Sequence, residues 1–177
     1  MACVVDGRLS HVVMLNKVFG LSELDGTAKV LLDHALRHHA GSLPIVLALI
    51  GGMGAGKTTL FRAMGTCLNC DPLPTSPTYA LIQEYRTADG KVVIHADLDR
   101  LRGPEEWLDL DPEHLLDRAD WVWLEWPERA GPYLPASTLF YKLETLVQAT
   151  ALRGAGMDSA EVPHQRRLTW MDGLDSF

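Results

Sequence analysis

The chain has few cysteines and no long apolar run. Three of its 177 residues are cysteines, and Cys67 and Cys70 form one C-x-x-C pair near the end of an expected helix. A zinc site needs four ligands and a redox pair usually opens a helix, so we expect buried or half-buried thiols. No apolar stretch approaches the roughly 20 residues of a membrane span, and residues 1–6 lack a signal-peptide pattern. We therefore expect a cytoplasmic protein with no membrane segment.

Basic side chains are also scarce relative to acidic ones. The sequence has 16 lysines and arginines against 23 aspartates and glutamates, a formal net charge of −7. Proteins that hold nucleic acid by themselves usually present a basic face, so any link to nucleic acid should run through a partner. A hydrophobic content of 47% suits a globular protein with a substantial core.

A glycine-rich segment at residues 51–58 carries the clearest functional signal. Its sequence, GGMGAGKT, matches G-x-x-x-x-G-K-[ST] in full. The apolar residues 45–50 before it are typical of a buried strand, and Leu60, Phe61 and Met64 after it recur at helical spacing. Such a strand, turn and helix N-terminus cradle phosphate, because backbone N–H groups and the helix dipole face the anion. We therefore expect a nucleoside triphosphate to bind here.

Individual residues of this segment have different expected roles in nucleotide binding. Lys57 is expected to reach the β- and γ-phosphates, and the Thr58 hydroxyl to ligate Mg²⁺. The alternative is a glycine-rich turn followed by Lys and Thr by chance, and it leaves the agreement of spacing and flanks unexplained. The residues expected to contact the nucleotide here are Gly52, Met53, Gly54, Ala55, Gly56, Lys57, Thr58 and Thr59.

The other segments predict alternating helices and strands. A helix is predicted over residues 24–39, and its histidines His34, His38 and His39 complement the dipole of a helix C-terminus, so we assign no metal to them. Asp89-Gly90 separates two expected strands and predicts an antiparallel hairpin. Strands are predicted at 79–86, 91–97, 121–126, 138–143 and 167–171, and short helices begin at 104 and 112.

Hydrolysis of a nucleotide needs a carboxylate near Mg²⁺ and a group that senses the γ-phosphate. Asp97 and Glu125 each end an expected strand, where ligands of open α/β sheets bind. For each, the alternative is an ordinary exposed acid at a strand end. Thr78, in a proline-stiffened S-P-T loop after the P-loop helix, is a candidate switch residue, against the alternative of a simple Pro-Thr turn.

Five short motifs follow one another in this chain: GAGKTTL at 54–60, SPTY at 76–79, HADLDRL at 95–101, PEE at 104–106 and EWPERA at 125–130. In this order and spacing, from residue 21 to residue 143, they resemble the bacterial TsaE family of P-loop ATPases of the tRNA threonylcarbamoyladenosine pathway. Each motif is modest alone, but five in one order are highly specific.

The resemblance implies roles for individual residues. Thr58 and Glu125 would ligate Mg²⁺, Thr78 would act as the switch-like sensor, and Asp97 would support hydrolysis. Trp126 would lie beside the nucleotide.

For the base of the nucleotide, the resemblance implies two further contacts. A residue near the start of the first helix would touch the base, and Thr27 is the match. An arginine of the last strand, Arg166 or Arg167, would also reach the nucleotide.

The resemblance also implies cofactors and partners. ATP and Mg²⁺ would bind, and the ATP cycle would support repeated threonylcarbamoyl transfer to an adenosine of tRNA by a TsaB–TsaD pair. The partners would hold the tRNA, which the chain would meet only indirectly, in agreement with its acidic charge. Two residues depart from the family pattern: Gly52 replaces the usual Asp, and Asp99 the usual Tyr. If the strand continues, Asp99 would share a face with Asp97 and could raise a carboxylate pKa.

The elements and the resemblance together predict an α/β fold, a P-loop NTPase-like three-layer sandwich. Its sheet would be mixed and mainly parallel, with an antiparallel hairpin insertion. We expect an irregular N-terminal extension at 1–20, a P-loop ATPase domain at 21–150 and a C-terminal extension with a possible final strand at 151–177.

Other functions are open at this point. A P-loop small-molecule kinase would need an arginine-rich lid, and the available arginines form no compact group in the sequence. A chain that binds ATP as an assembly switch and hydrolyses little is a second alternative. A GTPase is disfavoured, because residues 16–19, NKVF, lack the final Asp of a guanine-reading N-K-x-D and precede the P-loop.

Overall fold

A single mixed sheet organises the chain. The computed structural model describes residues 15–39, 41, 44–74, 80–146 and 165–171. The strands are β1 (Asn16–Phe19), β2 (Ile45–Ile50), β3 (Cys70–Asp71), β4 (Ile82–Thr87), β5 (Val92–Asp97), β6 (Trp121–Glu125), β7 (Leu139–Leu146) and β8 (Gln165–Met171). The helices are α1 (Leu24–His38), α2 (Lys57–Cys67), α3 (Glu105–Leu108) and α4 (Pro112–Asp117), with short 3-10 turns η1 (Leu21–Glu23), η2 (Pro127–Arg129) and η3 (Gly131–Tyr133).

The sheet is parallel at its centre and antiparallel on both flanks. Its strand order is β1-β8-β7-β2-β6-β5-β4-β3. Strand β2 lies parallel to both β6 and β7, and β5 lies parallel to β6. The pairings of β1 with β8, β8 with β7, β5 with β4 and β4 with β3 are antiparallel. The mixed sheet and its hairpin are confirmed, but the expectation of a mainly parallel sheet is right only for the centre. The flank at β4 and β5 is antiparallel because these strands are joined by a tight turn at Gly90, whereas parallel neighbours need a longer crossover connection.

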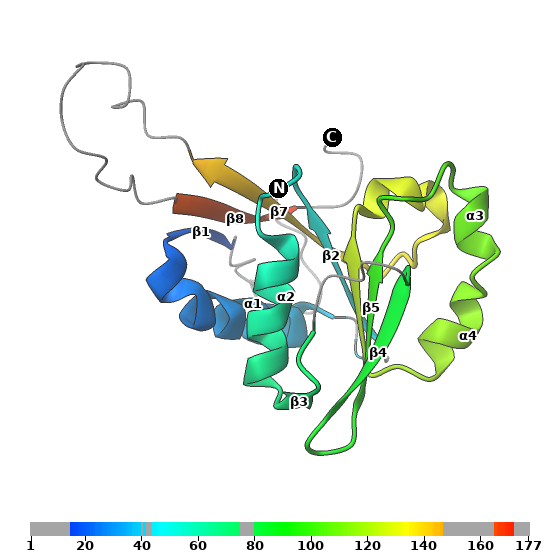
Figure 1. Ribbon diagram of the computed structural model, residues 1–177, viewed down its shortest axis with the longest axis horizontal. Helices are drawn as coiled ribbons and strands as arrows, with labels where there is room; N and C mark the ends of the chain where they lie inside the picture. Colours follow the sequence, from blue (N-terminus) through cyan, green and yellow to red (C-terminus); the bar gives the residue numbers. More distant parts are fainter. Residues whose placement is uncertain (1–14, 40, 42–43, 75–79, 147–164, 172–177) are drawn as a thin grey trace, which may run out of the picture.

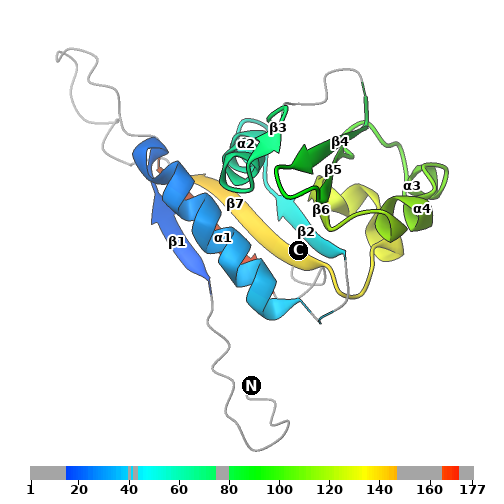
Figure 2. The same ribbon diagram turned by 90° about the horizontal axis from the view of Figure 1, so that it is seen from below.

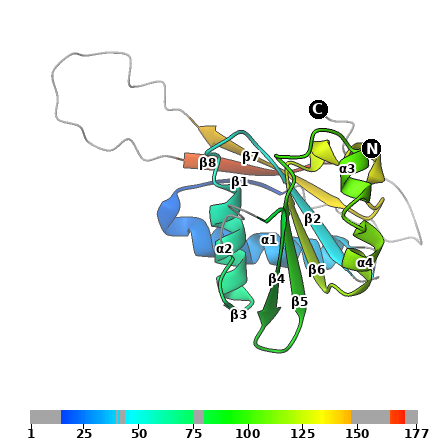
Figure 3. The ribbon, with the colours of Figure 1, turned by 45° about the vertical axis from the view of Figure 1, so that its right-hand side comes forward.

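Helices cover both faces of this sheet, which confirms the three layers. Figures 1 and 3 show α1 and α2 on one face and α3 and α4 on the other. All six residues of β2 are buried, as expected for a strand covered on both sides. Leu47 and Leu49 pack into the core beneath α1 and α2, whereas Ala48 and Ile50 join Trp107 in the core beneath α3 and α4.

Helix α1 matches the helix predicted from the sequence. Its buried face includes Ala28, Leu31, Leu32 and Ala35, and Figure 2 shows it running beside β1. His34 is also buried, and its Nδ1 lies 2.8 Å from the hydroxyl oxygen of Tyr141 on β7. This histidine therefore contributes to packing between α1 and the sheet.

The N-terminal segment differs from expectation. Residues 16–19 were expected to belong to an irregular extension, but they form β1, the edge strand beside β8. A four-residue strand has too little alternation to stand out, and its partner lies about 150 residues further along the chain. The expected final strand at 167–171 is confirmed as part of β8.

The structure also bears on the cysteines and on the expectation of no membrane segment. Cys67 is half-buried and Cys70 is buried, as expected, and burial raises the pKa of both thiols, that of Cys70 to about 11. Across the described parts of the chain, no helix has the length and apolar character needed to cross a membrane.

Candidate nucleotide-binding site

The glycine-rich turn between β2 and α2 lies at the carboxyl end of the central strand. Two of its glycines are required by close contacts. A Cβ on Gly51 would lie 2.4 Å from the carbonyl oxygen of Leu143, and Gly56 has a φ of +100° with the Arg166 Nε 3.1 Å from where its Cβ would be. Glycine thus lets the turn approach β7 and β8 and lets α2 begin at Lys57. This confirms the predicted strand, turn and helix.

Lys57 is held over the turn. Its ammonium donates hydrogen bonds to the carbonyl oxygens of Gly51, at 2.7 Å, and Gly52, at 3.2 Å. The same nitrogen lies 4.0 Å from the centroid of the Trp126 ring, a cation–π contact. Burial lowers the pKa of Lys57, and the nearby carboxylates of Glu125 and Asp97 oppose that shift. The structure thus places a buried cation at the turn where phosphates would bind.

Thr58 and Glu125 meet directly, although 67 positions separate them in the sequence. The Thr58 hydroxyl donates a hydrogen bond of 2.7 Å to Glu125 Oε1. Glu125 ends β6, which neighbours β2 in the sheet, and only 3% of its surface is exposed. The reading of Glu125 as an ordinary exposed strand-end acid is therefore wrong.

Asp97 lies next to Glu125 across the parallel pairing of β5 and β6. Its Oδ1 accepts a hydrogen bond of 3.1 Å from the backbone N–H of Asp99. Burial raises the pKa of Asp97, and the charges of Glu125 and Asp99 add smaller increases that the Asp99 hydrogen bond opposes. The predicted strand end is confirmed, because β5 ends at Asp97, whose side chain caps the turn that follows. Asp99 therefore lies beyond the strand and does not share a strand face with Asp97.

Trp126 follows β6 in a strained conformation. Its φ is +56°, in the left-handed region that a bulky residue rarely adopts, and Pro127 then opens η2. Such strain persists only where surrounding structure enforces it, and often at functional sites. Here the turn sets the indole beside the Lys57 ammonium, so Trp126 lies next to the glycine-rich turn.

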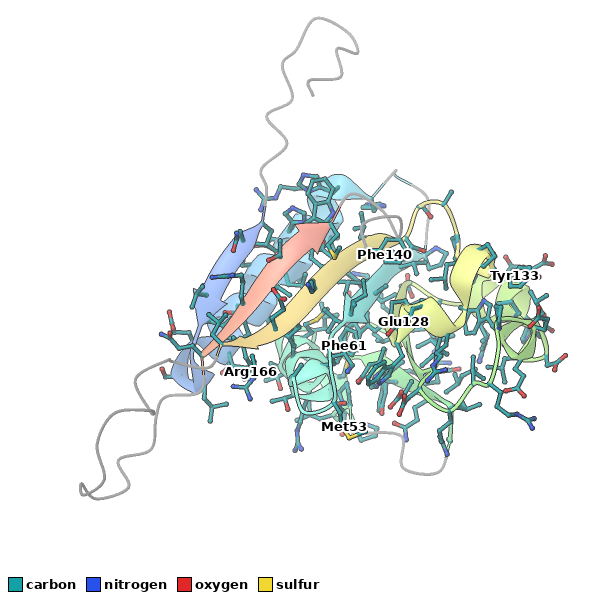
Figure 4. All side chains as sticks on the ribbon, turned by 90° about the horizontal axis from the view of Figure 1, so that it is seen from above. Met53, Phe61, Glu128, Tyr133, Phe140 and Arg166 are labelled. Atoms are coloured by element: carbon teal, nitrogen blue, oxygen red, sulfur yellow. The ribbon has the colours of Figure 1, made fainter. Side chains whose placement is uncertain are left out.

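A pocket lies on the other side of the turn, toward β1 and β8. Its lining is mostly apolar and consists of Phe19, Gly20, Leu21, Leu24, Gly56, Thr59 and Arg166. The Arg166 guanidinium donates through Nε to the carbonyl oxygen of Ala55, at 2.9 Å. In Figure 4, Arg166 lies on the β8 side of α2 and Glu128 lies on the opposite side.

The lining of this pocket includes some of the residues that the resemblance suggested for the base and leaves out others. Arg166 lines it, whereas the neighbouring Arg167 does not. Thr27 is not in the lining either: its side chain is fully buried and its hydroxyl donates to the Glu23 carbonyl oxygen at 2.9 Å. The first helix reaches the pocket through Leu24 instead, because Thr27 faces the core one turn later.

The remaining predicted residues vary in placement. Met53 is 87% exposed at the tip of the turn (Figure 4). A Cβ on Gly52 would meet no atom within 4 Å, so the structure leaves room for a side chain to begin at this position. Thr78 lies outside the residues that the structure describes. Sequence reasoning missed His95, whose Nε2 lies 3.0 Å from Glu125 Oε1. Its place two residues before Asp97 was visible, but a lone histidine within a strand gives no signal.

The β2–turn–α2 unit within a three-layer mixed sheet defines the fold class, a P-loop NTPase-like α/β protein. A crystal structure of Bacillus subtilis YdiB shares this fold, with a TM-score of 0.51 and 23% sequence identity, covering 89% of this chain and 86% of that one. The chain belongs to the TsaE family: the family model described as Threonylcarbamoyl adenosine biosynthesis protein TsaE matches residues 22–152.

Curated relatives agree with this assignment. The chain is 37% identical over 130 residues to the tRNA threonylcarbamoyladenosine biosynthesis protein TsaE of Nostoc, covering 70% of this chain and 74% of that protein. It is 35% identical over 100 residues to the TsaE protein of Haemophilus influenzae, covering 56% of this chain and 63% of that protein. The family is thus one involved in tRNA threonylcarbamoyladenosine biosynthesis.

Proposed function

We propose that this chain binds ATP with Mg²⁺ at residues 51–58 and hydrolyses it in support of threonylcarbamoyladenosine modification of tRNA. The observation that carries the proposal is the 2.7 Å contact between Thr58 Oγ1 and Glu125 Oε1. It joins the hydroxyl of the phosphate-binding motif to a buried carboxylate from a neighbouring strand. This pairing is the one expected of a P-loop magnesium site.

The donor set suits Mg²⁺. This cation prefers oxygen ligands and is usually held by one or two protein groups together with phosphate oxygens and waters. Thr58 and Glu125 would supply the protein oxygens, and Lys57 would supply a second positive charge for the phosphates. When bound, Mg²⁺ would neutralise negative charge on the phosphate oxygens as the terminal phosphate is transferred.

Asp97 is the residue that we propose for the attacking water. An ionised carboxylate can accept a hydrogen bond from water and orient it, and Asp97 ends its strand level with Glu125. The same burial that raises its pKa makes its ionised form a better proton acceptor. Asp97 would thus orient water while Glu125 would serve the metal.

The partners that we propose are a TsaB–TsaD pair, with tRNA contacted only through them. The names of the relatives place those proteins in tRNA threonylcarbamoyladenosine biosynthesis. A formal net charge of −7 disfavours direct binding of tRNA by this chain. A division of labour follows, in which the partners hold the RNA and this chain supplies the ATP cycle.

The kinase alternative finds little support in the arginines. Arg102 pairs with Glu106 four residues on, and Arg118 pairs with Glu84 of β4. Both are pairs at the protein surface, and each engages its arginine with a nearby carboxylate. The weakly hydrolysing assembly switch has more support. Asp97, Asp99 and Glu125 place three carboxylates close together at one strand end, and the charges of Glu125 and Asp99 favour the neutral form of Asp97. A neutral carboxyl group is a poor proton acceptor for the attacking water.

The test of the proposal is to mix the purified chain with the TsaB–TsaD pair and follow phosphate release from ATP. We expect hydrolysis to rise on mixing and to be lost in Glu125→Ala, while Glu113→Ala, an exposed change on α4, behaves as wild type. Complex formation without added hydrolysis would favour the assembly switch. The kinase alternative would be favoured if no complex forms, hydrolysis does not rise, and the chain alone phosphorylates a small hydroxyl compound.

A further inference from the structure

His95 is a fully buried histidine placed directly behind the Thr58–Glu125 contact. It lies on β5, has no exposed surface, and its Nε2 is 3.0 Å from Glu125 Oε1. Its ring and that of Phe61 of α2 form a T-shaped contact, at 5.1 Å between ring centroids, and Phe61 in turn stacks on Trp123 of β6. Complete burial and the contact with Phe61 therefore hold the imidazole in place.

The hydrogen bond to Glu125 determines which nitrogen of His95 carries the proton. An ionised carboxylate only accepts hydrogen bonds, so Nε2 is the donor. The other nitrogen, Nδ1, is buried and has no hydrogen-bond partner in the described part of the chain. In the neutral ring this nitrogen is a bare acceptor. Burial of this polar ring costs desolvation free energy, and the hydrogen bond to Glu125 is the interaction that offsets it.

Glu125 is consequently held from one side. Thr58 and His95 both donate to Oε1, and no side chain among the described residues donates to Oε2. Thr58 is itself expected to turn toward Mg²⁺, so it cannot by itself define where the carboxylate lies. His95 can, because packing fixes its ring.

We propose that His95 is a positioning residue, whose Nε2–H fixes the Glu125 carboxylate in the orientation that receives Mg²⁺. The proposal rests on the proposed function, in which Mg²⁺ accompanies ATP at this site. His95 is too deeply buried to touch the nucleotide, and it acts through Glu125. Groups that orient metal ligands in this way typically contribute about 10- to 100-fold to metal affinity.

Two substitutions separate the hydrogen bond from the histidine itself. The side-chain nitrogen of Gln can occupy the place of Nε2, whereas Asn is one methylene shorter and does not reach Glu125. The measurement is ATP affinity by titration calorimetry in excess Mg²⁺ and again in EDTA, and the ratio of the two affinities is the gain linked to the metal. Thermal unfolding of each variant shows that it folds.

We expect His95→Gln to keep the wild-type gain and His95→Asn to lose about 10- to 100-fold of it, with the affinity in EDTA unchanged in both. A matched control is Leu115→Ala on α4, a buried change in the core on the other face of the sheet, which should lower the melting temperature while keeping the gain. Full gain in His95→Asn would overturn the proposal, as would equal loss in both His95 variants or the same loss in Leu115→Ala. Wild-type protein that binds ATP in neither buffer would instead refute the proposed function.

The wild-type chain gives an independent test should His95→Asn fail to fold. In ¹⁵N-histidine NMR spectra we expect His95 to carry its proton on Nε2. We also expect that signal to shift when Mg²⁺ is added to the ADP-bound protein. The proposal would be overturned if the proton is on Nδ1 and Nε2 carries none. It would also be overturned if the His95 ring signal does not shift when Mg²⁺ is added.

Discussion

The two sides of the P-loop differ in chemistry. Toward β5 and β6, the turn faces buried ionisable groups: Lys57 under Trp126, and Glu125 bonded to Thr58 and His95. Toward β1 and β8, it faces a mostly apolar pocket with Arg166 in its lining. Charged phosphate and metal chemistry suits the first side, and a flat, weakly polar base suits the second.

The contrast follows from the sheet. Parallel strands β5 and β6 bring their carboxyl ends, and hence Asp97 and Glu125, to the carboxyl end of β2. The antiparallel strand β8 instead brings Arg166, near its beginning, to the same end of the sheet. The polar side should therefore control metal and turnover, and the pocket side should control affinity alone.

The largest loss of ATP affinity should come from a change of Lys57 on the polar side. Lys57→Ala removes the buried cation that would pair with the phosphates, and we expect ATP affinity to fall at least about 100-fold, roughly 3 kcal/mol. Titration calorimetry measures it, with Lys29→Ala, an exposed change on α1, as the control. ATP affinity that is normal in Lys57→Ala would refute the assignment of the P-loop.

A change on the polar side should separate turnover from stability. Asp97→Asn keeps an oxygen that accepts from Asp99 but removes the charge, and we expect hydrolysis in the presence of TsaB–TsaD to fall about 100-fold. ATP affinity should change little, because Asp97 makes no proposed contact with the phosphates.

The same variant should gain stability at neutral pH. Folding raises the pKa of Asp97, so the folded chain holds this proton more tightly than the unfolded chain does. Its contribution to stability therefore falls as pH rises from the unfolded pKa through the folded one. We expect Asp97→Asn to melt above wild type at pH 7, with the difference vanishing below about pH 3.8. The exposed Asp109→Asn serves as control, and a stability difference independent of pH would contradict this account.

The smallest effect should lie on the pocket side. Arg166→Ala removes a lining side chain and its hydrogen bond to Ala55, so we expect ATP to bind about 5-fold more weakly, roughly 1 kcal/mol. The gain in affinity from Mg²⁺ should be unchanged. Arg167→Ala, at the next position of β8 and outside the lining, should match wild type. If Arg166→Ala alters the Mg²⁺ dependence, the two sides are not separate.

The polar side was predictable from the sequence in large part. Lys57 and Thr58 follow from one local motif, and Glu125 and Asp97 follow from the rule that strand ends meet at a ligand. His95 did not follow, because its role depends on the register of β5 against β6 and on the packing of Phe61, which are tertiary facts.

The pocket side was much less predictable. β1 is a four-residue strand whose partner lies about 150 residues away, so nothing local indicates that Phe19 and Arg166 share a pocket. Thr27 was matched through the resemblance to a residue near the start of the first helix, but it is fully buried, and Leu24, one turn earlier, lines the pocket instead.

The central claim is that Thr58 and Glu125 form a magnesium site for a bound nucleotide. The most direct test is the ATP affinity of wild type and Glu125→Gln, each measured with Mg²⁺ and with EDTA. Gln keeps the shape of the side chain and removes its charge. We expect Mg²⁺ to strengthen ATP binding in wild type and to have little effect in Glu125→Gln, with equal affinities in EDTA. An equal gain from Mg²⁺ in both proteins would contradict the claim.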